Sequence, residues 1–315
     1  MRLGASFSPR RARQAGLDWQ AAFKQLLTLG LDPIRLSAYW DEVDQEGYGS
    51  LDWQLDEVAR AGRRALLSVG MKAQGWPEFY IPQRLVPTAR RCADVAASSA
   101  ALRSAALDLL HATVQRYLDH PALLAWQVEN EPFNRSGPNR WWIGPDFLRQ
   151  EMAAVRAGDP GRPRLLTAFS HFNLVLDIVS NPWRLGIGRL LELLGPGDVL
   201  GLDVYVRIGY RLAIFEGVAR AASNWADEAA RWRTRAEAAG AQAWIAEAQA
   251  EPWEATPATS MRPRSFLARD IPGVVAALRG AGFQTVLLWG SEYWLARAAA
   301  GDRSWLEAVL ALPRL

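Results

Sequence analysis

Short apolar runs alternate with amphipathic segments along the whole chain, and this alternation limits the possible folds more than any other feature. Each apolar run has the length and composition of a buried strand, and an amphipathic, helix-like segment usually follows it. Strands that alternate with helices predict a parallel sheet, because each helix carries the chain back to the edge where the strand began. The predicted strands are Arg2–Ser6, Pro33–Leu36, Ala65–Val69, Leu123–Val128, Arg164–Ala168, Asp198–Val204, Ala243–Ala246 and Thr285–Trp289.

Eight such units in 315 residues predict a single (β/α)8 barrel of the TIM type over residues 1–315. The alternative is a doubly wound sheet, which usually opens with a Gly-x-Gly-x-x-Gly turn, and Gly4-Ala5-Ser6 does not fit that pattern. Helices are expected at Trp19–Leu29, Gln54–Ala61, Leu102–Leu118 and Ser304–Leu310. Another helix is expected to end near Ala157, and a long one near Ala239. The segment Phe172–Leu194 is expected to form a broken helix.

The charge balance argues against nucleic-acid binding. The chain has 36 Lys and Arg residues and 33 Asp and Glu residues, and its cations are mostly scattered arginines, whereas a binding face needs a cluster. A lone Cys92 cannot form an internal disulfide, and three histidines without close spacing do not indicate zinc. We expect no metal and no organic cofactor.

The N-terminal stretch MRLGASFSPRRARQ lacks the apolar core of a signal peptide, so we expect a cytoplasmic protein, or a secreted one if a leader was removed. No apolar run reaches the roughly 18–20 residues of a membrane span. Pro182–Leu194 mixes large apolar residues with arginines, as an interfacial membrane helix does, but a helix packed on the barrel is the favoured interpretation. The sequence carries no signal for an oligomeric state.

The stretch Leu123–Phe133, read as LLAWQVENEPF, is the strongest functional signal. Its apolar run ends abruptly in Glu129-Asn130-Glu131-Pro132, so a buried strand delivers carboxylates to one rim of the sheet. In a parallel barrel, the rim at the carboxyl ends of the strands is where catalysis takes place. Glu131 is therefore predicted to be a catalytic acid. Glu129 has the same strand parity, so a local distortion is expected to orient Glu131.

Polar and aromatic residues also follow the other predicted strands. Trp and Tyr side chains suit the apolar faces of sugar rings, and fixed polar groups suit their hydroxyls. A carbohydrate is therefore the expected partner. The predicted substrate-binding residues are Trp289, Trp40, Trp76, Glu292, Asp41, Lys72, His171 and Glu129.

A second carboxylate, Glu247, closes the seventh predicted strand. Strands four and seven face each other across the mouth of an eight-stranded barrel, so Glu131 and Glu247 are expected to form a pair. Two facing carboxylates suggest glycoside hydrolysis, with retention at a separation of about 5–5.5 Å and inversion at about 6.5–9.5 Å.

Asn130-Glu131-Pro132 after strand four, a Glu closing strand seven and a Trp closing strand eight together resemble clan A of the glycoside hydrolases. The resemblance covers essentially the whole chain and implies a retaining (β/α)8 enzyme. It implies that Glu131 is the acid/base, Glu247 the nucleophile and Trp289 the platform beneath the scissile subsite.

The same resemblance implies that Asn130 binds the sugar 2-hydroxyl, that Arg35 keeps the nucleophile charged, and that Tyr205 donates a hydrogen bond to it. Two positions depart from the common pattern. Asp203 stands where several clan families have a His, and Glu129 gives a Glu-Asn-Glu triplet also found in β-galactosidase-type members.

These observations predict a retaining β-glycosidase. The alternatives are an endo-acting β-glucanase, mannanase or xylanase, since long loops after strands two to four can form a pocket or a cleft, and a barrel that binds carbohydrate without catalysis. The sugar stays open at this point.

Overall fold

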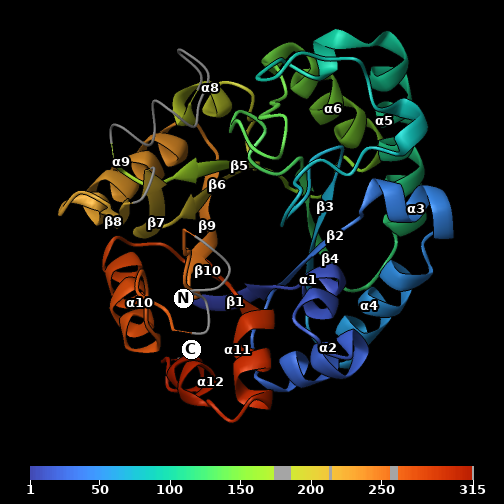
Figure 1. The fold of residues 1–315 in the computed structure, drawn as a ribbon. Helices are drawn as coiled ribbons and strands as arrows, with labels where there is room; N and C mark the ends of the chain where they lie inside the picture. Colours follow the sequence, from blue (N-terminus) through green and yellow to red (C-terminus); the bar gives the residue numbers. More distant parts are fainter. Residues whose placement is uncertain (174–185, 213–214, 256–261, 314–315) are drawn as a thin grey trace.

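The computed structural model describes residues 1–173, 186–212, 215–255 and 262–313. Its centre is a closed barrel of eight parallel strands in the order β1-β10-β9-β6-β5-β4-β3-β2, which β1 closes by pairing with β2. Helices surround the barrel, as Figure 1 shows. This architecture confirms the predicted (β/α)8 fold. The barrel strands are β1 Arg2–Ser6, β2 Ile34–Ser37, β3 Ala65–Val69, β4 Leu123–Val128, β5 Arg164–Ser170, β6 Val199–Val204, β9 Gln242–Gln249 and β10 Thr285–Trp289.

The strands form where the sequence places continuous apolar runs, because both faces of a barrel strand are buried. Four strands have the predicted bounds. The largest difference is β9, which extends from Gln242 to Gln249 because its second half pairs with both β6 and β10. Glu247 therefore lies inside the strand rather than after it.

A small apolar cluster fills the inside of the barrel. A Cβ on Gly201 would touch Leu165, Thr167 and Ala246, so neighbouring strands pack closely there. The cluster consists of Leu66, Ala125, Leu165, Val199, Trp244, Ala246 and Leu287. A much larger apolar layer lies between the strands and the surrounding helices.

The helices cover the outside of the barrel. Several short helices at the rim, namely α1, α3 and α11, and the longer α10, were not predicted. The helices are α1 Pro9–Gln14, α2 Trp19–Thr28, α3 Trp40–Glu46, α4 Gly49–Arg60, α5 Ala100–Tyr117, α6 Pro145–Gly158, α8 Ile187–Leu191, α9 Trp225–Ala238, α10 Ile271–Gly280, α11 Ser291–Ala299 and α12 Ser304–Leu310, with short 3-10 turns η1 Gln83–Leu85, η2 Ala96–Ser98 and η4 Ala268–Asp270.

The segment after β6 corrects the sequence analysis. A long helix was expected there, but the chain first forms an antiparallel hairpin of β7 Arg207–Leu212 and β8 Phe215–Arg220. Only then does α9 begin. The hairpin leaves Leu212 and Phe215 strongly exposed.

Part of the expected broken helix lies outside the described residues, since they omit 174–185. The described remainder contains α8, where Leu190 is buried against the main core. This part of the segment packs on the barrel next to β5. None of the helices described here has both the length and the hydrophobicity needed to cross a bilayer.

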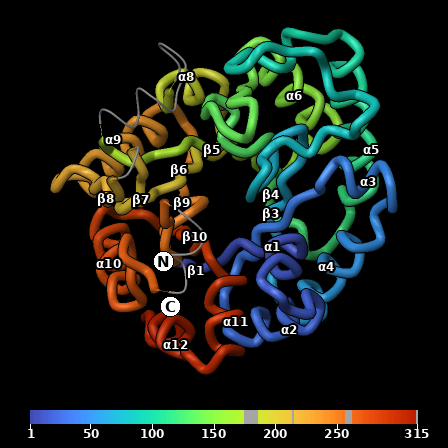
Figure 2. The backbone as a smooth tube through the Cα atoms, viewed as in Figure 1, coloured from blue at the N-terminus to red at the C-terminus, as the bar shows by residue number. Residues whose placement is uncertain are grey.

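The backbone trace in Figure 2 shows the first and last strands of the barrel, β1 and β10, side by side. This follows from the closure of the barrel, because β1 pairs in register with β10, with Arg2 opposite Thr285.

Candidate active site

Glu131 lies just beyond the end of β4, where the backbone leaves the extended conformation. Glu129 has a φ of 60° and Glu131 a φ of 43°, both in the left-handed region that residues other than glycine rarely adopt. These angles confirm the expected distortion. The turn gives the two carboxylates different directions although they are two residues apart.

The Glu129 carboxylate points back into the protein. It accepts hydrogen bonds from the backbone N–H groups of Met71, at 2.8 Å, and Lys72, at 2.6 Å. A Cβ on Gly70 would clash with this carboxylate, so the glycine makes room for it. Glu129 is fully buried and holds the end of β3 against the end of β4, which is a supporting position rather than a substrate contact.

Lys72 is also fully buried. Its Nζ donates to the backbone carbonyls of Glu131, at 2.7 Å, and Asn134, at 3.2 Å, and forms an ion pair with Glu78 at 3.7 Å. The lysine therefore fixes the loop that carries Glu131.

Two further hydrogen bonds, burial and nearby charges set the properties of Glu131. Its N–H donates to Thr167 Oγ1 at 2.8 Å, and Asn134 Nδ2 donates to its Oε2 at 2.7 Å. Burial raises the pKa of the Glu131 carboxyl to about 8. The negative charges of Glu247 and Glu78 also raise this pKa, whereas the Lys72 ammonium lowers it. Glu131 thus holds a proton at neutral pH.

Glu247 is 3% exposed and lies within β9. Arg35 Nη1 donates to its Oε1, and the Tyr205 hydroxyl donates to its Oε2. Both carboxylate oxygens of Glu247 are therefore held in place, one by a residue of β2 and the other by the residue that follows β6.

Arg35 is held by a ring of acceptors around its guanidinium. Its Nε donates to Gln127 Oε1 at 2.7 Å and its Nη2 to Asn130 Oδ1 at 2.5 Å. Because Oδ1 of Asn130 is occupied in this way, the amide N–H groups of Asn130 are the part left to meet a ligand.

Glu131, Asp203 and Glu247 form one cluster, in which one carboxyl oxygen of each residue lies within 4.8 Å of one oxygen of the others. The structure therefore brings the predicted pair Glu131 and Glu247 together at the rim of the barrel. Three such carboxyls also resemble a cation site. However, Arg35 already supplies positive charge at Glu247, and both oxygens of Glu247 are occupied.

Trp289, at the end of β10, is 7% exposed and packs with Phe169, Tyr205 and Ile208. The Arg11 guanidinium lies 4.5 Å from the centroid of its ring. Trp289 is therefore close to Tyr205, and an arginine lies over one side of its ring.

The remaining predicted aromatic residues occupy two different environments. Trp40 is 4% exposed and packs with Met71 and Val95 in a separate apolar cluster. This corrects the expectation that it presents a stacking surface. Trp76 is 64% exposed and lines an outer pocket together with Arg10, Arg13, Gln14, Glu42, Gln45, Glu46 and Pro77.

The polar residues Glu292 and Asp41 are bound to arginines. Glu292 accepts from Ser8 N at 2.6 Å and from Arg11 Nε at 3.1 Å, so it holds the loop after β1. Asp41 pairs with Arg10 at 2.7 Å, beside the outer pocket.

His171 is fully buried just after β5. Its Nδ1 contacts the Tyr205 carbonyl, and because a carbonyl only accepts, Nδ1 carries the proton. Its Nε2 has no hydrogen-bond partner among the described residues. Burial lowers the pKa of His171, so the ring is neutral at pH 7.

Several site residues were missed by the sequence analysis. Gln127 and Asn134 flank the recognised triplet and bind Arg35 and Glu131. Trp253 is 42% exposed and meets Tyr205 edge-on, with ring centroids 4.8 Å apart. The sequence did contain a signal for Trp253, because it is an aromatic residue shortly after the predicted nucleophile Glu247. Arg11 gave no local signal, because its partners Glu251 and Glu292 lie far away in sequence.

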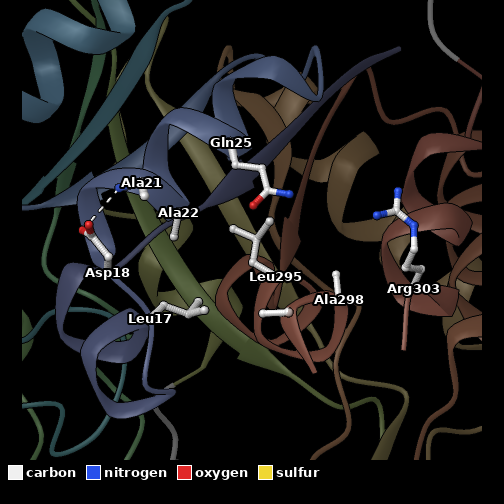
Figure 3. A pocket seen from close by; sticks show the side chains of 9 residues that line it. Leu17, Asp18, Ala21, Ala22, Gln25, Leu295, Ala298 and Arg303 are labelled. Carbon is white, nitrogen blue, oxygen red and sulfur yellow. Dashed lines mark hydrogen bonds between the residues drawn. The ribbon is translucent and has the colours of Figure 1, made fainter. Parts of the chain in front are cut away.

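A shallow pocket between α2 and α11 contains none of these residues. Figure 3 shows it lined mainly by alanine and leucine side chains, with Gln25 and Arg303 at its edge. Asp18 is used structurally, since its carboxylate caps the N-terminus of α2. The candidate active site is therefore the carboxylate cluster at the barrel rim.

The comparisons with known proteins agree with the fold. No family model matches the chain, and no curated protein matches it in sequence. Among solved structures, a GH5_18 protein from Streptomyces cattleya in complex with GlcNAc is 19% identical, with a TM-score of 0.61 over 99% of this chain and 82% of that one.

A β-galactosidase from the Antarctic haloarchaeon Halorubrum lacusprofundi is 15% identical, with a TM-score of 0.63 over 98% of this chain and 57% of that one. An exo-β-1,4-mannosidase from Opitutaceae bacterium strain TAV5 is 16% identical, with a TM-score of 0.60 over 92% of this chain and 51% of that one. This chain thus spans little more than half the length of these two enzymes. At these identities the likeness concerns the fold alone, which is the closed (β/α)8 barrel described above.

Proposed function

We propose that this protein is a retaining β-glycosidase. The observation that carries the proposal is the pair Glu131 and Glu247, which approach within 4.8 Å, one holding a proton and the other held by Arg35 and Tyr205. The structural neighbours with mannosidase and β-galactosidase names support a β-linked sugar as substrate.

In the first half-reaction, the Glu247 carboxylate attacks the anomeric carbon and forms a C–O bond. The glycosidic bond breaks with its electron pair on the leaving oxygen, which takes the proton of Glu131. Asn134 occupies Oε2 of Glu131, so Oε1 is the oxygen placed to carry that proton.

In the second half-reaction, the Glu131 carboxylate removes a proton from water, and the water oxygen attacks the anomeric carbon. The ester bond to Glu247 then breaks, and its electron pair returns to the carboxylate beside Arg35. The configuration is inverted twice and so retained. The amide N–H groups of Asn130 are placed to bind the sugar 2-hydroxyl during both steps.

Aromatic side chains support the choice of a sugar. Trp253 offers an exposed ring next to Tyr205, and Trp289 at the end of β10 lies in the same cluster as Tyr205. His171 Nε2 is available as a hydrogen-bond acceptor for a hydroxyl. Together these groups supply the apolar faces and fixed polar contacts that a sugar ring requires.

An endo-acting enzyme on a polysaccharide is the second candidate. It is favoured by the outer pocket, where the exposed Trp76 stands beside Glu42 and the Arg10–Asp41 pair. An aromatic ring flanked by planar polar groups suits a second sugar unit at a distance from the cleavage point.

The test is hydrolysis of a panel of aryl β-glycosides by the wild type and by Glu247→Ala, with and without azide. We expect the wild type to cleave one sugar, the variant to be inactive, and azide to restore turnover with a glycosyl azide of inverted configuration. If the wild type hydrolyses no aryl glycoside but cleaves a polysaccharide, the protein is the endo-acting enzyme. Sugar binding without turnover of either class contradicts the proposal.

A further inference from the structure

Asp203 is a buried carboxyl that the mechanism above does not use. It lies on β6 opposite Glu247 of β9 and Phe169 of β5. It is fully buried, and neither of its oxygens has a hydrogen-bond partner of normal geometry among the described residues. Yet one of its oxygens is within 4.8 Å of oxygens of both Glu131 and Glu247.

A carboxylate in this position is costly. The neighbouring cation, Arg35, directs its N–H groups to Glu247, Asn130, Gln127 and Ser6, and none of these bonds goes to Asp203. A buried charge without a paired, hydrogen-bonded partner takes up a proton rather than stay ionised. Asp203 is therefore a carboxylic acid, with an O–H that can donate.

Burial and two neighbouring carboxyls favour the protonated form of Asp203. Glu247 from β9 and Glu131 from the end of β4 add negative charge, while Arg35 from β2 opposes them, and burial is the largest effect raising the Asp203 pKa. β5 contributes Thr167, which is not titratable in this range and only weakly favours the charged form. Tyr205, on the same strand, stays protonated because burial also raises its pKa.

We propose that Asp203 is a positioning residue for catalysis, a neutral acid whose O–H donates to Glu131 once Glu131 has given up its proton. In the first half-reaction the negative charge moves from Glu247, which becomes an ester, to Glu131. Arg35 remains directed at Glu247, and Asn134 meets one oxygen of Glu131. Asp203 is the O–H donor near enough to stabilise the other oxygen, directly after a side-chain rotation or through one water.

This inference rests on the proposed glycosidase function, but its first test requires no turnover. Melting temperatures of the wild type and Asp203→Asn are measured between pH 4 and pH 8. A buried acid with a raised pKa stabilises the fold fully at pH values below its unfolded pKa, near 4, and loses that contribution as pH rises. We expect Asp203→Asn to melt several degrees higher than the wild type at pH 8, with a gap that closes towards pH 4.

Asp198→Asn is the matched control. Asp198 is an equally buried aspartate just before β6, but it is bound by Arg164 Nε at 2.7 Å and Arg156 Nη2 at 2.6 Å. Its replacement is expected to lower the melting temperature at pH 7. If Asp203→Asn behaves like Asp198→Asn, then Asp203 is an ionised partner of Arg35 and the proposal is wrong.

The second test uses the cleaved sugar as a dinitrophenyl β-glycoside, for which hydrolysis of the glycosyl-enzyme limits kcat. Asp203→Leu should lower kcat about 10- to 100-fold, as expected for loss of a hydrogen bond to a charged group, with kcat/KM changed less than about threefold. Asp203→Asn retains an N–H donor and should lose less. An equal loss in kcat and kcat/KM, or equal losses in both variants, overturns the proposal. Absence of all wild-type turnover instead refutes the glycosidase function, while the melting data still decide the protonation of Asp203.

Discussion

The ion pair of Arg35 and Glu247 gives the sharpest test of the active-site geometry. Arg35 is fully buried, Glu247 is 3% exposed, and the guanidinium also bridges Gln127 and Asn130. Removing one partner of such a pair leaves the other charge buried and uncompensated, which typically costs about 3–5 kcal/mol. Arg35→Met and Glu247→Gln should therefore each destabilise the fold by about that amount.

The double variant is expected to lose less than the sum of the two single losses, because it leaves no unpaired charge. The coupling energy should reach about 2–3 kcal/mol, near the upper end for residues in direct contact. It is measured by urea unfolding of the four proteins at pH 7. The exposed pair Arg149 and Asp146, 3.0 Å apart, is the control, and its cycle should show little coupling. Additive losses at Arg35 and Glu247 would refute the assigned ion pair.

Activity gives a second readout of the same variant. Without Arg35, the buried Glu247 carboxylate loses its paired cation, and an unpaired buried charge is unfavourable. The kcat/KM of Arg35→Met should therefore fall at least about 100-fold at pH 6 and recover partly with rising pH. A loss that is the same at every pH would mean that Arg35 only shapes the site.

Three further predictions concern other residues. Because the Glu131 pKa is about 8, kcat/KM should fall above about pH 8, where this acid loses its proton. The Glu131→Gln variant should melt at a higher temperature than the wild type at pH 8 but not at pH 4, since a raised carboxyl pKa stabilises the fold only at lower pH. Trp76→Ala should raise KM for an oligosaccharide several-fold and leave aryl glycoside kinetics unchanged. Glu151 faces Glu129, and burial raises the pKa of both carboxyls, that of Glu129 to about 7. In thermal melts, the Glu151→Gln variant should therefore be increasingly more stable than the wild type from pH 5 to pH 8.

The barrel and the proximity of Glu131 and Glu247 could be predicted because their signals are local. Each barrel strand is a continuous apolar run, and Glu131 comes directly after one such run. Glu247 lies within β9, but its neighbours are apolar, so a carboxylate in that position was conspicuous. Even the distortion at Glu129 and Glu131 followed from counting strand parity.

Other features depend on contacts that no local pattern reveals. The Arg11 bonds to Glu251 and Glu292 join residues 240 and 281 positions apart, and only barrel closure brings them together. The β7–β8 hairpin was missed because its connection, between Leu212 and Phe215, has no Asn-Gly or Asp-Gly turn signal. The position of Trp40 was predicted wrongly because the side chain of a residue after a strand can point into an apolar cluster beside the rim as well as into the mouth of the barrel.

The properties of Asp203 depend both on its local sequence and on contacts with residues that are distant in the sequence. Along the sequence it is an aspartate in an apolar run, which suggests only that β6 reaches a polar region. In the barrel it lies between Phe169 of β5 and Glu247 of β9, near the apolar cluster that contains Leu165 and Ala246. An aspartate there weakens the fold unless it stays protonated, and three carboxyls with one arginine can remain uncharged overall only if two of them hold protons. Among the described residues, neither Glu131 nor Asp203 has a cationic hydrogen-bond donor on its carboxyl oxygens. In the proposed mechanism the negative charge that leaves Glu247 therefore moves to Glu131, with Asp203 beside it as a hydrogen-bond donor.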